Sequence, residues 1–119
     1  MEPIKTTMQA GGNYSANQYH FVVTASDGQI DPVAAAGGAA DGILYDKPDA
    51  AGKAASVVIF GVARVKAGVA IAVGQEVASD ASGKAKASAT GNRVLGRALE
   101  ASSADGDIIK ILFRPSTTT

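Results

Sequence analysis

Residues 61–114 read GVARVKAGVAIAVGQEVASDASGKAKASATGNRVLGRALEASSADGDIIKILFR, and this stretch decides the fold. Short apolar segments alternate in it with turns rich in Gly, Asp, Ser and Asn, at the spacing of about eight to twelve residues that is typical of compact all-β domains. In the last segment Ile109, Ile111 and Phe113 fall on one face of a strand, because successive side chains of a strand point to opposite faces. No long stretch has helical periodicity, so we predict an all-β fold.

The residues before Gly61 extend the same pattern. Residues 19–24 (YHFVVT) are β-branched and aromatic, which predicts the first strand. Residues 55–60 (ASVVIF) form the most apolar strand, which predicts a central position in the sheet. We therefore expect residues 18–114 to form one small β-barrel or β-sandwich-like domain.

Residues 1–17 (MEPIKTTMQAGGNYSAN) show neither helical nor strand periodicity. They predict an extended N-terminal arm, and residues 115–119 predict a short C-terminal tail. The sizeable apolar side chains of the arm are Ile4, Met8 and Tyr14. We expect these side chains to dock the arm on a neighbouring subunit.

The composition indicates assembly rather than a large core within one chain. Of the 119 residues 46% are hydrophobic, but much of this is Ala, aromatic residues make up 5%, and Trp is absent. Burial stabilises a protein by roughly 25 cal/mol per Å² of apolar area, and Ala contributes little area. We therefore expect a marginally stable monomer whose apolar surface is partly buried against other chains. An Ala-rich domain of a thermophile is the alternative.

Charge and cysteine content exclude several classes of function. The 11 basic and 11 acidic residues cancel without forming blocks, so neither nucleic acid nor a membrane surface is an expected partner. Cys is absent, which removes disulfides and thiol chemistry. The N-terminal residues lack the apolar core of a signal peptide, and no window has the length of a membrane span, so we expect synthesis in the cytoplasm.

No arrangement of residues indicates catalysis, a cofactor or a metal ion. His20 is the only histidine and lies among strand residues, which favours a structural or surface role. DGD at residues 105–107 is superficially similar to a calcium loop, but the remaining ligand spacing is missing and a turn explains it better. GK at residues 52–53 lacks both ends of a phosphate-binding loop. We expect no enzyme activity.

Basic residues gather on alternating strand positions of the C-terminal half. The candidates for an electrostatic contact face are Arg64, Lys66, Arg93 and Arg97, with Lys84 and Lys86 in the same part of the chain. Such a face fits an acidic protein surface as its partner. A solvated strand face, whose lysines prevent aggregation, is the plainer alternative.

The order of these turns and strands resembles a known family. The motifs that carry the resemblance are GVA at 61–63, VKAG at 65–68, VGQEV at 73–77, DASGK at 80–84, GNRVLGRALEA at 91–101 and DGD at 105–107, followed by an apolar last strand. They are similar to the motifs of the capsid cement (head decoration) proteins of tailed bacteriophages. The similarity covers about residues 55–114 and concerns strands and turns, so it bears on the fold and not on chemistry.

This resemblance implies a β-rich structural protein on the outer surface of an icosahedral phage head. It implies trimers that bind the major capsid protein at local three-fold positions and clamp neighbouring capsid subunits against the pressure of the packaged DNA. It also implies a terminal arm that reaches across neighbouring subunits, so we expect Ile4, Met8 and Tyr14 to dock the arm either on the capsid surface or on a neighbouring subunit. Many weak contacts, made simultaneously, hold such a protein in place.

Two other classes of protein stay open. KAG at residues 66–68 and VGQEV at residues 73–77 are also similar to the hairpins of biotinyl and lipoyl carrier domains. Lys84 is the candidate for the modified lysine, but the usual flanking acidic and Met residues are missing. A small enzyme or ligand-binding β-barrel needs a pocket with converging polar groups, and the sequence offers only scattered Asp and Arg.

Overall fold

Every helix or strand within residues 3–114, the part of the chain that the computed structural model describes, is a β-strand. In chain order the strands are β1 (Ile4–Gln9), β2 (Phe21–Thr24), β3 (Ile30–Pro32), β4 (Gly42–Leu44), β5 (Ala54–Lys66), β6 (Glu76–Ser79), β7 (Ala85–Ala87), β8 (Gly96–Ala98) and β9 (Ile108–Phe113). The predicted all-β fold is confirmed. Residues 1–2 of the predicted arm and the predicted tail, residues 115–119, lie outside the described residues.

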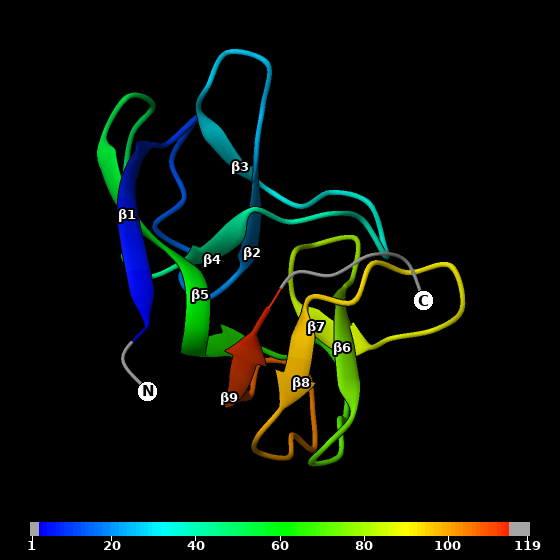
Figure 1. The fold of residues 1–119 in the computed structure, drawn as a ribbon. Helices are drawn as coiled ribbons and strands as arrows, with labels where there is room; N and C mark the ends of the chain where they lie inside the picture. The colour runs from blue at the N-terminus through cyan, green and yellow to red at the C-terminus, as the bar shows by residue number, and fades with distance from the viewer. Residues whose placement is uncertain (1–2, 115–119) are drawn as a thin grey trace.

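β5 is the strand around which the others are arranged (Figure 1). Its first half pairs with β1 and, at Val57 and Val58, with β4. Its second half, from Gly61 to Lys66, pairs with β9. Gly61 separates the halves and has a φ of 113°, which glycine adopts without steric cost. The central position predicted for residues 55–60 is confirmed.

The sheet curls into two halves that share β5. Strands β1 to β4 lie in the upper part of Figure 1, and strands β6 to β9 lie in the lower part. Hydrogen bonding runs in the order β3-β2-β4-β5-β9-β8-β6-β7, and β1 is joined to β5 off this path. A bridge between Ala10 and Ile30 brings the end of β1 to β3, and a bridge between Ala67 and Ala85 brings the end of β5 to β7. These bridges curl each half toward a barrel, as the sequence predicted.

Apolar side chains form two cores. The smaller core lies in the upper half and consists of Val22, Ile30, Leu44, Ala55 and Val57. The larger core joins the halves, because it contains Phe21 from β2 and Phe113 from β9, whose ring centroids are 6.0 Å apart. Phe113 is buried together with Ile109 and Ile111, so the face predicted for the last strand is confirmed.

The N-terminal segment differs from its prediction of an irregular conformation, because Ile4–Gln9 forms β1 and pairs with β5. Alternation is present: Thr6, Met8 and Ala10 are less exposed than the residues between them. The sequence hides this pattern, because two of these three inward residues are a threonine and an alanine. The alternation of apolar and polar residues therefore does not reveal β1 in the sequence, because pairing with β5 sets the register of this strand.

The segment that follows β1 is held by polar contacts. The Tyr14 backbone N–H donates to the carbonyl oxygen of Pro48 over 2.8 Å, and the Tyr14 hydroxyl donates to the Asp31 carboxylate. Burial, together with this hydrogen bond and the charge of Asp31, raises the pKa of Tyr14 to about 12. Tyr14 therefore keeps its proton in neutral solution and ties the segment to β3.

Candidate interaction surface

The outer face of β5 and β9 presents the side chains that do not enter the core. Ala63 and Val65 of β5 point inward, so Val62, Arg64 and Lys66 point outward. On β9 the buried Ile109, Ile111 and Phe113 leave Ile108, Lys110 and Leu112 on the outside. Arg64 and Lys66 thus lie on the face opposite to Ala63 and Val65, in agreement with the alternating strand positions predicted for these basic residues.

Two cations face each other across this surface. The antiparallel register places Arg64 directly opposite Lys110, between the pairs Val62–Leu112 and Lys66–Ile108. Like charges in directly opposed positions destabilise a sheet, by an amount comparable to the roughly 0.2–1 kcal/mol that a favourable pair contributes. Among the described residues, the ion pairs within 4.0 Å are Lys53–Asp49 and Lys84–Asp105, and neither involves Arg64 or Lys110.

The predicted basic residues only partly come together. Arg64 and Lys66 lie on β5, and Arg97 lies two strands away on β8, opposite Leu112 of β9. Arg93 lies outside the strands, and its backbone N–H donates to the carbonyl oxygen of Gly37. Sequence reasoning missed Lys110 as a member of this face, because its position opposite Arg64 depends on the pairing of strands far apart in the chain.

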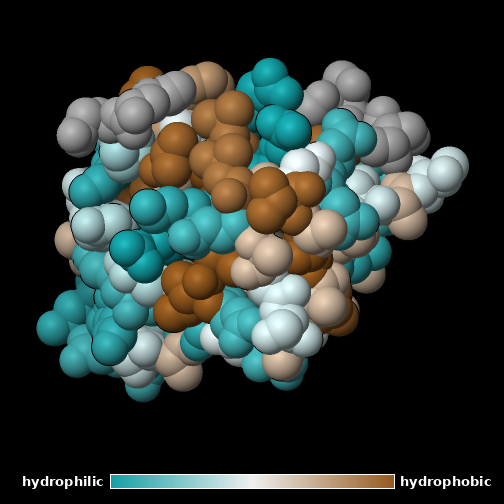
Figure 2. Space-filling view, turned by 90° about the horizontal axis from the view of Figure 1, so that it is seen from below, coloured by the Kyte–Doolittle hydropathy of each residue, from teal (hydrophilic) through white to brown (hydrophobic). Residues whose placement is uncertain are grey.

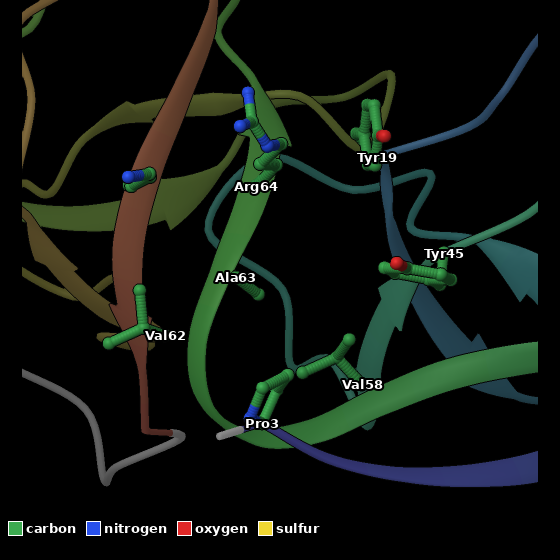
Figure 3. Close-up of a pocket in the computed structure, with 8 residues that line it drawn as sticks. Pro3, Tyr19, Tyr45, Val58, Val62, Ala63 and Arg64 are labelled. Carbon is green, nitrogen blue, oxygen red and sulfur yellow. The ribbon is translucent and has the colours of Figure 1, made fainter. Parts of the chain in front are cut away.

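A shallow depression of about 170 Å³ lies beside this pair of cations. Its lining residues are Pro3, Tyr19, Tyr45, Val58, Val62, Ala63, Arg64 and Lys110. Figure 3 shows Tyr19 and Tyr45 on one side of the β5 segment that carries Ala63 and Arg64. The lining contains two cations and two phenol groups but no carboxylate, so the depression is cationic.

Lys5 adds a third cation next to this depression. Its ammonium nitrogen lies 3.8 Å from the centroid of the Tyr45 ring, a distance at which a cation is attracted by the face of the ring. Because Lys5 belongs to β1 and Tyr45 directly follows β4, the contact links the strands on either side of β5. Lys5 thereby orients the Tyr45 ring.

Tyr19 reaches the depression through an unusual backbone conformation. Its φ of 67° is left-handed, which costs an ordinary L-residue roughly 1–2 kcal/mol. Two hydrogen bonds hold this conformation: the Tyr19 N–H donates to Leu44 O over 2.7 Å, and Tyr19 O accepts from the Lys66 N–H over 2.8 Å. The strand predicted from residue 19 therefore begins only at Phe21.

Several large apolar side chains are exposed, and one of them, Tyr45, also lines the depression. The members of this group are Ile4, Tyr45, Phe60, Val69, Val73, Leu99 and Ile108. Ile4 and Phe60 are direct cross-strand partners and are 55% and 39% exposed. Figure 2 shows one face of the molecule with broad hydrophobic areas next to polar ones. Such surface is available to other chains.

The predicted arm residues have different environments. Met8 and Tyr14 pack against the smaller core of their own chain, whereas Ile4 stays exposed. In this structure Ile4 is therefore the arm residue whose apolar side chain is most available to a neighbour.

The remaining candidates for chemistry have structural environments. His20 is buried, and its Nδ1 lies 2.9 Å from the carbonyl oxygen of Ser82. Burial is the largest influence on the His20 pKa and lowers it. Asp107 accepts hydrogen bonds from the backbone N–H groups of Ser103 and Ala104, which lowers the Asp107 pKa and fixes the turn before β9.

Lys84 is not freely exposed at a turn, as the modified lysine of a carrier domain must be. Its ammonium nitrogen lies 2.9 Å from Asp105 Oδ1, and its side chain is 26% exposed. Within residues 3–114 there is no group of three or more His, Cys, Asp or Glu residues that could hold a metal ion. The same part of the chain has no helix long and apolar enough to cross a membrane.

Comparison with known proteins gives a family and several similar chains among the solved structures. Residues 3–114 match the family model described as phage cement protein. The fold is similar to the crystal structure of the N base of head fiber gp8.5 in bacteriophage phi29, with a TM-score of 0.75, 20% sequence identity and coverage of 99% of each chain. No curated protein matches the sequence.

Proposed function

Because the chain belongs to the phage cement protein family, a family of structural phage proteins, we propose that it decorates and stabilises the outer surface of an icosahedral phage head. The observation that carries this proposal is the family match, which extends over residues 3–114 and so includes both halves of the sheet. The family that the strand and turn motifs of residues 55–114 resembled is thereby confirmed.

The proposed mechanism is a clamp between neighbouring major capsid subunits. Exposed apolar residues at two places support it. Ile4 and Phe60 lie at the bend of β5, and Val69 and Val73 lie in the loop before β6. A protein that contacts two capsid subunits at once opposes their separation, and simultaneous contacts make its release slow.

We propose a homotrimer as the unit that decorates the head. Val73 is 65% exposed. Its loop is hydrogen-bonded to the end of β8, where Gly74 N–H donates to Ala98 O, and to the segment after β8, where Ile71 N–H donates to Ser102 O. Val69, Val73 and Leu99 therefore lie in adjacent segments and suit contact with another copy. A mass measurement in solution tests this, and a species that stays monomeric at high concentration would contradict it.

In this proposal the arm and the domain make different contacts. The arm, residues 1–17, contacts a neighbour through Ile4, while the domain of residues 18–114 supplies the remaining contacts. Synthesis takes place in the host cytoplasm, and assembly adds the protein to the outside of the head.

The test of the proposed function uses purified phage heads that lack this protein. The protein is added, and bound protein is measured by co-sedimentation and by cryo-electron microscopy of the exterior. We expect new protrusions on the head surface and a higher temperature of DNA release. Absence of binding to heads at micromolar concentrations would refute the proposal.

A fibre base is the second candidate function. The similarity over 99% of each chain to the N base of a head fiber favours this candidate. In that case the protein occupies the head surface and also holds a further, elongated component. Microscopy of complete virions separates the two functions, because a cement protein leaves low protrusions and a fibre base carries an extended density.

A further inference from the structure

We propose that the depression lined by Tyr19, Tyr45, Arg64 and Lys110 receives a single carboxylate side chain, an Asp or a Glu, from an acidic segment of the capsid surface. This inference rests on the proposed function, since it names the chemistry of the partner that the protein contacts. It goes further in locating one anchoring contact within the exposed surface.

The first support is charge. Arg64 and Lys110 lie opposite each other on adjacent strands, and no ion pair within residues 3–114 neutralises either one. Glu100 accepts a hydrogen bond from the Lys110 backbone N–H over 2.9 Å, which places it at the strand backbone. A carboxylate between two cations relieves their repulsion and forms charge-assisted hydrogen bonds with both. Lys5, held against Tyr45, adds positive potential at the same place.

The second support is size. The depression has a volume of about 170 Å³, close to the roughly 150 Å³ of a cavity that holds one benzene molecule. Pockets for metabolites and cofactors have volumes of roughly 300–1,000 Å³. The depression therefore accommodates one side chain of a partner rather than a free ligand. Val58, Val62 and Ala63 also line the depression, and their apolar side chains suit the methylene groups of that side chain.

The third support is the backbone of Tyr19. A bulky residue with positive φ is a strained feature that persists only where the surroundings enforce it, and such features cluster at functional sites. Here the strained residue brings an aromatic ring to the depression, whose lining also includes Arg64 and Lys110. The hydrogen bonds of the Tyr19 N–H to Leu44 O and of the Lys66 N–H to Tyr19 O enforce this conformation, and they hold the ring at the depression while the next residue, His20, is buried.

The first test uses a paired charge removal. The variant R64Q/K110Q removes both cations of the depression, and the control K47Q/K53Q removes two exposed lysines from the loop before β5. Both variants lose two positive charges, so they change the net charge equally. We expect R64Q/K110Q to fold with unchanged or higher thermal stability, because it removes a repulsive pair.

Binding to heads lacking the protein is then measured at low and at moderate salt. We expect R64Q/K110Q to bind about tenfold or more weakly than wild type, and the control to bind within about twofold of it. Equal binding of R64Q/K110Q and wild type would overturn the inference while leaving the proposed function intact. If wild type itself does not bind heads, the proposed function fails, and the second test decides the inference.

The second test needs no heads. Propionate, which corresponds to the end of a Glu side chain, is titrated into the isolated protein, and propionamide serves as the neutral isostere. We expect saturable NMR shifts of Tyr19, Tyr45 and Arg64 signals with propionate alone, and the loss of the Tyr19 and Tyr45 shifts in R64Q/K110Q. The absence of such shifts, or equal shifts with propionamide, would show that the depression does not select a carboxylate.

Discussion

Replacing Phe113 by Ala is expected to weaken the larger core severely. Phe113 is fully buried at the end of β9, and its ring packs against Phe21 with a centroid separation of 6.0 Å. Phe→Ala changes in cores cost about 3–5 kcal/mol, from lost burial and the cavity that remains. The matched control is Phe60→Ala: Phe60 is 39% exposed, so the same chemical change should cost below about 1 kcal/mol.

These free energies convert into melting temperatures. Unfolding entropy is about 2.1 cal/mol/K per residue near 60 °C, so for 119 residues each 1 kcal/mol lowers Tm by about 4 °C. Phe113→Ala should therefore lower Tm by about 12–20 °C and Phe60→Ala by less than about 4 °C. Differential scanning calorimetry measures both. In a double-mutant cycle, Phe21→Ala should show a coupling with Phe113→Ala of about 0.5–1.5 kcal/mol.

A comparable fall in Tm for Phe113→Ala and Phe60→Ala would refute this reasoning. It would mean that the packing of Phe113 between the two halves of the sheet stabilises the protein no more than an exposed side chain does. A small loss for Phe113→Ala alone would instead mean that neighbouring side chains collapse into the space.

Three further predictions concern a close approach and two titrations. In Gly96→Ala, the new Cβ would lie 2.2 Å from the Leu112 carbonyl oxygen, so β8 must move away from β9. The free energy of unfolding, measured by chemical denaturation, should fall by about 1–3 kcal/mol. A variant as stable as wild type would contradict the close approach of β8 and β9. Burial lowers the pKa of His20 below 6.5, so the contribution of His20 to stability is complete above pH 6.5 and is lost as the pH falls. Chemical denaturation at a series of pH values should show this loss of stability in wild type and a smaller loss in His20→Gln. An equal loss in the two proteins would refute the role of His20. The raised pKa of Tyr14 predicts a tyrosinate absorbance change near pH 12 that disappears in Tyr14→Phe, and the stability linked to this group is complete below pH 10 and is lost toward pH 12.

Much of the fold could be predicted because local patterns determine it. In residues 61–67 and 108–113 the alternation of side chains is strict, and the structure follows it. The turn at residues 80–83 was predictable for the same reason: Asp80 Oδ1 accepts hydrogen bonds from the Ser82 and Lys84 N–H groups, as Asp does in many turns.

The rest depends on contacts between residues far apart in the chain. β1 was not predicted because its pairing with β5 sets its register and its inward residues are not strongly apolar. The conformation of Tyr19 was not predictable, since bonds to Leu44 and Lys66 enforce it. The same limit explains the incomplete candidate site. Arg64 was identified from the pattern of β5, but Lys110 becomes its partner only through the register of β5 against β9.

The bend of β5 also determines where the two ends of the described chain lie. β1 begins with Ile4 opposite Phe60, and β9 ends with Phe113 opposite Gly61, the next residue along β5. The two ends of the described chain therefore lie next to adjacent residues of β5, close to each other. A short Gly-Ser linker could join them, and new ends could be opened at the exposed turn around Gly28. The fold is thus suited to circular permutation. A peptide fused to the new ends would lie at the turn around Gly28, at the far end of the upper half, instead of at the bend of β5.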